Sequence, residues 1–223
     1  SAASDVYKRQ VIDKIEEESG RMQLLVEDLL ALTRAEGTRL DRKTVDMQKV
    51  VDSAVSSARA AYPERSIEVD NQCARPPMVN GDPDRLHQVL MNLINNAFKH
   101  GGSDVDVTIT LRENLDRIVI EVADNGRGMA EEDAARIFDR FYRADASRHR
   151  AGGGGSGLGL AITKSLIEQH EGTITVDTAP GEGATFKISL PLLREVNGAT
   201  ATKATKATKA AQPAKDAKTP EKD

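Results

Sequence analysis

The first pattern along the chain is a run of mostly apolar positions spaced alternately three and four residues apart. It consists of Ile12, Ile15, Ser19, Met22, Val26 and Leu29. This spacing predicts a long helix over residues 11–36 that carries the seam of a coiled coil or four-helix bundle. The alternative is a surface helix packed on its own domain. A bundle helix is favoured because a lone helix would expose the seam. Residues 1–10 fit no pattern and are interpreted as a non-native or disordered leader.

Residues 37–193 alternate between helical and strand patterns and are predicted to form the main domain. Strands are predicted at residues 40–45, 67–69, 78–79, 105–111, 118–122, 173–176 and 184–190. Helices are predicted at residues 46–63, 82–101, 130–141 and 158–170, with Asp46 and Asp82 as N-caps of the first two. Within residues 194–223, the stretch from Ala199 to Lys209 repeats Ala-Thr-Lys, and the whole segment offers little to bury. It is predicted to be disordered, with weak helicity as the alternative.

Composition narrows the class of protein. Hydrophobic residues make up 39% of the chain and aromatic residues only 3%, so aliphatic side chains must build the core. The net charge is −4, and the tail is basic, so the body is acidic, which argues against nucleic-acid binding. The single Cys73 excludes an internal disulfide and fits a reducing compartment. Because no apolar run approaches the roughly 18 residues that span a bilayer and no signal peptide is visible, we expect a cytoplasmic location without membrane contact.

Two asparagines are the first candidates for chemistry. Asn92 and Asn96 lie four residues apart and therefore project from one face of a helix whose opposite face is apolar. Amide oxygens beside a nucleotide suit Mg²⁺, which takes hard oxygen ligands and shares them with phosphates. Lys99, one turn further on, can reach a phosphate. The alternative is an ordinary solvated Asn pair.

Two glycine motifs follow. In Asp124-Asn-Gly-Arg-Gly, the carboxylate can accept a hydrogen bond from an exocyclic amine, which selects adenine over guanine, although an ordinary turn is the alternative. Gly126 and Gly128 let the backbone pass close to a ligand. The glycine run at residues 152–159 opens directly into a helix, where main-chain N–H groups can hold phosphates. A flexible linker is disfavoured because an amphipathic helix follows at once, and no P-loop lysine is present.

Taken together and in this order, the motifs resemble those of sensor histidine kinases, in the superfamily that includes type II topoisomerases and mismatch-repair ATPases. Five stretches carry the resemblance, namely the N box, first glycine box, F box, second glycine box and a last small motif, at residues 92–100, 124–128, 137–143, 155–161 and 183–186. Residues 18–32 resemble the second helix of the family's dimerisation hairpin.

The resemblance implies an α+β fold: a two-layer α/β sandwich with a mixed, mostly antiparallel sheet and helices on one face, preceded by a long bundle helix. It implies ATP and Mg²⁺ as cofactors, with Asn96 as metal ligand. Residues 142–155 would form a lid over ATP, anchored by Phe138 and Phe141. The ATP-binding residues that it implies are Asn92, Asn96, Lys99, His100, Asp124, Gly126, Gly128, Arg143, Gly155, Ser156, Gly157, Leu158, Gly159 and Thr185.

One departure from the family pattern concerns the phosphoacceptor. None of the four histidines, His87, His100, His149 and His170, lies in an acceptor-like stretch, so no catalytic residue is assigned. We therefore expect the chain to bind Mg-ATP without autophosphorylating. The phosphoryl group would pass to a His on a missing helix and then to an Asp of a response regulator, within a homodimer formed through the hairpin helix. The alternatives are an anti-sigma-type serine kinase, an ATPase machine and a nucleotide-binding dimerisation module without catalysis.

Overall fold

The computed structural model describes residues 39–102, 104–143 and 156–193, together with seven positions between residues 11 and 26. The chain divides into two units, Ser1–Leu193 and Arg194–Asp223, of which the second lies outside the described residues. The predicted leader, residues 1–10, also lies outside them, as does most of the predicted helix of residues 11–36. The seven described positions are all helical. Among them, four seam residues are more than half exposed: Ile12, Ile15, Met22 and Val26.

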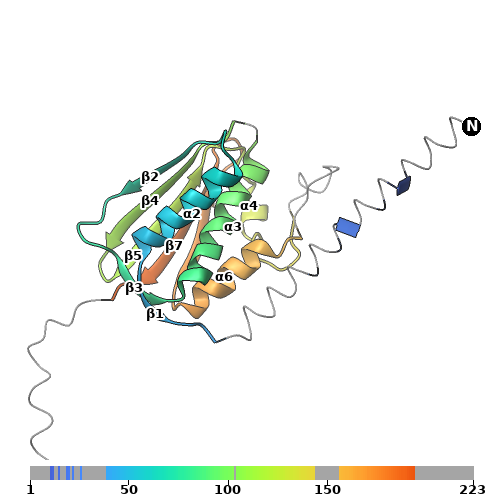
Figure 1. Ribbon diagram of the computed structural model, residues 1–223. Coiled ribbons are helices and arrows are strands. Elements are labelled where there is room, and N and C mark those ends of the chain that lie inside the picture. Colours follow the sequence, from blue (N-terminus) through green and yellow to red (C-terminus); the bar gives the residue numbers. More distant parts are fainter. Residues whose placement is uncertain are drawn as a thin grey trace, which may run out of the picture. The chain divides into compact units, whose positions relative to one another are not determined.

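A mixed five-stranded sheet forms one layer of the domain, in the order β2-β4-β5-β7-β6 (Figure 1). Its strands are β2 Ile67–Asn71, β4 Val107–Asn114, β5 Arg117–Asp124, β6 Thr173–Thr178 and β7 Ala184–Pro191. β2 pairs with β4 in parallel, and all other pairs in this sheet are antiparallel. A separate antiparallel ribbon joins β1 Lys43–Asp46 to β3 Met78–Gly81. The predicted mixed, mostly antiparallel sheet is confirmed.

Three helices form the second layer on one face of the sheet (Figure 1): α2 Met47–Ala61, α3 Pro83–Gly101 and α6 Gly159–Gln169. The two predicted N-caps are confirmed. The Asp46 carboxylate accepts a hydrogen bond from the backbone N–H of Gln48, and the Asp82 carboxylate accepts two from Asp84 and Arg85. Each cap satisfies N–H groups that have no partner within the helix. The start of α3, which carries both asparagines, is thereby fixed.

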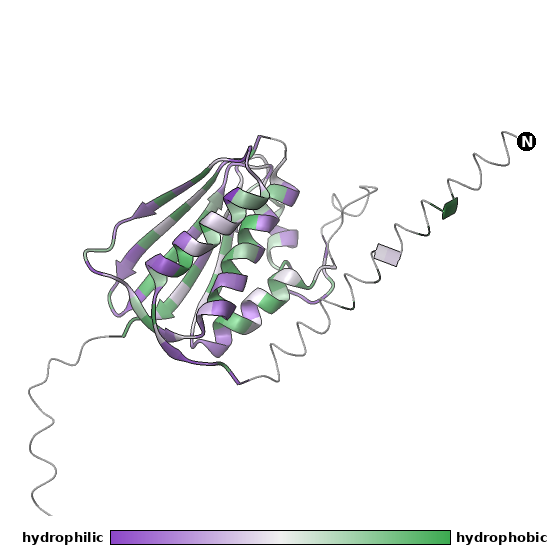
Figure 2. Cartoon of the chain, viewed as in Figure 1, coloured by the Kyte–Doolittle hydropathy of each residue, from purple (hydrophilic) through white to green (hydrophobic). Residues whose placement is uncertain are grey.

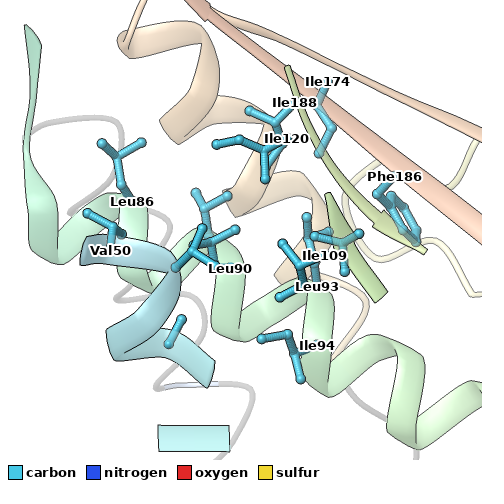
Figure 3. Packing of buried hydrophobic residues seen from close by; sticks show 14 of the residues in the cluster. Val50, Leu86, Leu90, Leu93, Ile94, Ile109, Ile120, Ile174, Phe186 and Ile188 are labelled. Atoms are coloured by element: carbon cyan, nitrogen blue, oxygen red, sulfur yellow. The ribbon is translucent and has the colours of Figure 1, made fainter. Parts of the chain in front are cut away.

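Aliphatic side chains fill the space between the two layers. Figure 3 shows Leu90, Leu93 and Ile94 of α3 meeting Ile109 and Ile120 of the sheet. The outward faces of the helices are mostly hydrophilic, as the colouring of Figure 2 shows. Burying a side chain of this size contributes about 1.5–3 kcal/mol. The cluster therefore holds α3 rigidly against the sheet. No helix among the described residues is both long and apolar enough to cross a bilayer.

The predicted helix over residues 130–141 is largely wrong. Only α4, Glu131–Ala134, is helical, and the chain then continues through tight turns. The physical reason is tertiary: Phe138 packs edge-on against Phe186, with ring centroids 6.3 Å apart, and Phe141 adopts a left-handed backbone at φ 62°. A continuous helix would not accommodate that backbone conformation.

Candidate nucleotide-binding site

A pocket of about 480 Å³ lies between α3, the loop that follows β5 and the start of α6. This volume is in the range of small-molecule sites. Ten of the predicted ATP-binding residues line it: Asn92, Asn96, Lys99, His100, Asp124, Gly128, Arg143, Ser156, Gly157 and Gly159. Segments far apart in the sequence thus meet at one site.

The other four predicted residues are placed differently. Gly155 lies outside the described residues. Gly126 and Leu158 are buried and are not part of the pocket lining that the structure describes. Thr185 follows Ala184, which does line the pocket, and successive strand side chains point to opposite faces. Its side chain therefore faces away from the site.

Asp124 is the last residue of β5 and is half-buried in the pocket wall. Its Oδ1 accepts a hydrogen bond from the backbone N–H of Gly126 at 2.9 Å. Burial raises the pKa of this carboxyl above its ordinary value, while backbone hydrogen bonds from Gly126 and Ala184 act in the opposite direction. A carboxylate held in this way can accept a hydrogen bond from an amine of a ligand.

The second glycine of the motif, Gly128, is required because of its backbone conformation and its close neighbours. Gly128 has φ 62°, and a Cβ at this position would lie 1.9 Å from the carbonyl oxygen of Ala179. No side chain fits there without moving the β6–β7 turn. The glycine motif therefore serves close packing of the backbone beneath the pocket.

An apolar wall, which the sequence reasoning missed, lines part of the pocket. It is formed by Met129, Ile137, Leu160, Pro180 and Ala184. Such a wall suits the flat face of a base. Four of its members, all except Pro180, lie inside or beside the motifs, but the sequence does not tell which apolar side chains face a ligand and which face the core.

Cationic groups gather on the same pocket. It is lined by Lys99 and Arg143, which were predicted, and by Arg127, which was not. Asn95 also lines it, and its Oδ1 accepts a hydrogen bond from the Tyr62 hydroxyl at 3.0 Å. Positive groups around one concave site favour a polyanionic ligand such as a triphosphate.

The amide of Asn92 connects the two helices that border the pocket. Its Nδ2 donates to the carbonyl oxygen of Gly159 at 3.3 Å and to the hydroxyl of Thr163 at 3.4 Å. No group of three or more His, Cys, Asp or Glu side chains in the described part of the chain could hold a metal. The oxygens of Asn92 and Asn96 instead fit a cation that takes its remaining ligands from phosphates and water, as Mg²⁺ does.

Phe141 and Gly157, which lie on either side of the predicted lid of residues 142–155, are joined at what we call the neck. The backbone N–H of Phe141 donates to the carbonyl oxygen of Gly157 at 3.0 Å. Beside it, the Tyr142 hydroxyl donates to Asp133 at 2.7 Å. Phe138 packs against Phe186, whereas Phe141 is 58% exposed and only its backbone joins the neck. That these two residues anchor the lid stays a prediction, because most of the lid lies outside the described residues.

Comparison with known proteins agrees with this geometry. Residues 81–194 match the family of histidine kinase-, DNA gyrase B-, and HSP90-like ATPases. The chain is 40% identical over 182 residues to the probable sensor histidine kinase TcrY of Mycobacterium tuberculosis, covering 81% of this chain and 38% of TcrY. It is 40% identical over 197 residues to the sensor-like histidine kinase SenX3 of the same organism, covering 87% of this chain and 48% of SenX3. The chain thus spans less than half the length of either relative.

Two solved structures extend the comparison. The mycobacterial sensor histidine kinase MprB aligns with a TM-score of 0.61 and 28% identity, over 69% of this chain and 100% of that one. Full-length ShkA in complex with AMPPNP aligns with a TM-score of 0.66 and 30% identity, over 84% of this chain and 39% of that one. The chain therefore belongs to the histidine kinase-, DNA gyrase B- and HSP90-like ATPases, and within them it is similar to the catalytic regions of sensor histidine kinases.

Proposed function

We propose that this domain holds Mg-ATP and presents the γ-phosphate to a histidine that is none of the four in this chain. The phosphoryl group then passes to an aspartate of a response regulator. One observation carries the proposal: a single pocket collects the half-buried Asp124, the amides of Asn92 and Asn96, and the cations Lys99 and Arg143. The structural relative ShkA, whose structure contains AMPPNP, supports a nucleotide as the ligand.

Each residue has a separate role in this proposal. Asp124 accepts a hydrogen bond from the adenine amine, and the apolar wall packs against the base. Lys99 and Arg143 neutralise the phosphates, which is the main task in phosphoryl transfer because little covalent chemistry falls to the protein. Asn96 and Asn92 would hold Mg²⁺, which when bound adds further charge neutralisation.

Among the described histidines, His170 is poorly placed to accept a phosphoryl group. His170 is 3% exposed, and both ring nitrogens are engaged: Nδ1 donates to the Leu166 carbonyl at 2.6 Å, and Nε2 accepts from the Asp82 N–H at 3.0 Å. Burial lowers the pKa of this imidazole, which fits its neutral form. His87 is at the α2–α3 surface, 3.4 Å from the Ser57 hydroxyl, and His100 is part of the pocket lining. His149 lies outside the described residues.

The proposal also includes a response regulator as partner, a homodimer, and a full-length protein that is anchored in a membrane by a segment other than this one. Their support is that the relatives are named sensor histidine kinases and are more than twice as long as the region they share with this chain.

Calorimetric titration of ATP, with Mg²⁺ and with EDTA, tests the nucleotide site. Wild-type protein should bind ATP more tightly with Mg²⁺. Asp124→Asn should weaken binding in both conditions by about 10- to 100-fold, because a hydrogen bond to a charged group contributes about 1.5–3 kcal/mol. Asn96→Ala should remove only the Mg²⁺-dependent part.

Asp116→Asn is the matched control, because Asp116 is exposed in the β4–β5 turn and should keep wild-type affinity. A folded wild-type chain that does not bind ATP would refute the proposal, as would wild-type affinity in Asp124→Asn. Stable ³²P incorporation at a histidine of the chain itself would contradict an acceptor outside it.

A further inference from the structure

Thr163 of α6 is a buried polar residue that the proposed chemistry does not use. It is 0% exposed and does not belong to the described lining of the pocket. Its hydroxyl donates to the carbonyl oxygen of Gly159, one turn earlier, at 2.9 Å. It also lies 3.4 Å from Nδ2 of Asn92, which reaches Gly159 O at 3.3 Å.

The chemistry of these three groups fixes the direction of the Asn92 amide. A peptide carbonyl can only accept hydrogen bonds, and the single proton of the Thr163 hydroxyl is already given to Gly159. Both groups that face Asn92 from α6 are therefore acceptors. The NH₂ end of the amide must turn toward them, and its Oδ1 is left for the pocket that Asn92 lines.

With the opposite orientation, the Asn92 amide could not bind a metal. It would place Oδ1 against two acceptor oxygens and turn NH₂, which cannot bind a cation, toward the ligand. The carbonyl oxygen of Gly159 opposes this flip through one long hydrogen bond with Nδ2 of Asn92. The hydroxyl of Thr163 opposes it through a second. A hydroxyl in the core thus controls which atom of Asn92 meets the ligand.

We infer that Thr163 is a positioning residue: it orients the amide of Asn92 so that an oxygen, rather than an NH₂ group, faces the metal and triphosphate. This inference rests on the proposed function. It assigns Thr163 no contact with ATP, and it predicts an effect that depends on the metal.

The test is Thr163→Val, which has nearly the same shape but no hydroxyl, beside Thr163→Ser, which keeps it. In the calorimetric titration, the valine variant should bind ATP about 3- to 10-fold more weakly with Mg²⁺, the effect of one modest hydrogen bond. It should match wild type in EDTA. The serine variant should match wild type in both conditions.

Ser165→Ala is the control for removal of a hydroxyl from the same helix, because the Ser165 hydroxyl accepts a hydrogen bond from Gln169 and not from Asn92. It should leave both affinities unchanged. A wild-type ratio of the Mg²⁺ and EDTA affinities in Thr163→Val would overturn the inference. An equal loss in both conditions would also overturn it, since it would show a merely structural role.

A second readout needs no nucleotide and separates this inference from the proposed function. The side-chain NH₂ protons of Asn92, assigned by NMR with the Asn92→Asp variant, should be protected from exchange in wild type and Thr163→Ser. They should lose that protection in Thr163→Val. Unchanged protection in Thr163→Val would refute the positioning role even if ATP binds as proposed. Loss of protection in a chain that does not bind ATP would support it while the proposed function fails.

Discussion

The carboxyl group of Asp124 acts on stability in the opposite direction to its action on binding. Burial raises its pKa, so the folded state prefers the protonated form. Stability from this preference is fully present below the pKa of the unfolded chain and is lost as pH rises through the folded-state pKa. At neutral pH the charged side chain therefore destabilises the ligand-free domain.

Asp124→Asn should accordingly stabilise the ligand-free protein at pH 7, because the amide oxygen can still accept the Gly126 N–H. We expect a gain below about 1 kcal/mol, since the group is partly solvent-screened, or up to about 2–4 °C in Tm. Thermal unfolding at pH 7 and near pH 4 measures it. The difference in Tm between the variant and wild type should be smaller at the lower pH. A lower Tm of the variant at pH 7 would contradict this account.

The neck of the lid depends on one glycine. Gly157 has φ 75°, and a Cβ at this position would lie 2.8 Å from the carbonyl oxygen of Tyr142. Gly157→Ala should therefore cost about 1–3 kcal/mol and disturb the Phe141–Gly157 hydrogen bond. Chemical denaturation measures the loss.

Gly159→Ala is a control from the same glycine box. A Cβ there meets nothing within 4 Å, and Gly159 is the first residue of α6, so its stability should stay the same or rise. Equal losses in the two variants would mean that the neck geometry is not what makes Gly157 necessary.

Elements with local signals were predictable from the sequence. The caps at Asp46 and Asp82 and the alternation in β5 depend on residues that are neighbours in the sequence. The end of α4 is not, because the chain turns after Ala134 and brings Phe138 against Phe186 on a distant strand. The contact of Asn92 with Thr163 joins residues 71 positions apart, and no local pattern marks it. Thr185 was placed at the site because its motif is there, but the alternation of side chains along β7 puts it on the face opposite to Ala184.

The exposed seam on the N-terminal helical residues bears on assembly. Ile15 is 62% exposed and Met22 68% exposed, although both are apolar. Such a seam is stable in water only when another helix covers it. We expect the chain to dimerise through it, and Ile15→Asp with Met22→Asp to yield monomers.

Mass measured across a range of protein concentrations tests this expectation. The doubly substituted chain should keep wild-type ATP affinity, because the pocket lining described here contains neither residue. Ile15→Leu with Met22→Leu is the matched control and should still dimerise. A wild-type chain that stays monomeric at every concentration would rule the seam out as a self-association surface.

The hydrogen bond that closes the neck of the lid affects how easily the length of the lid segment can change. Because the backbones of Phe141 and Gly157 are hydrogen-bonded to each other, the two ends of the intervening segment are held close together. Lengthening a loop whose ends are already together costs little, about 0.6 kcal/mol for each doubling. Insertions and deletions between Arg143 and Ser156, both of which line the pocket, should therefore change the stability of the rest of the domain little.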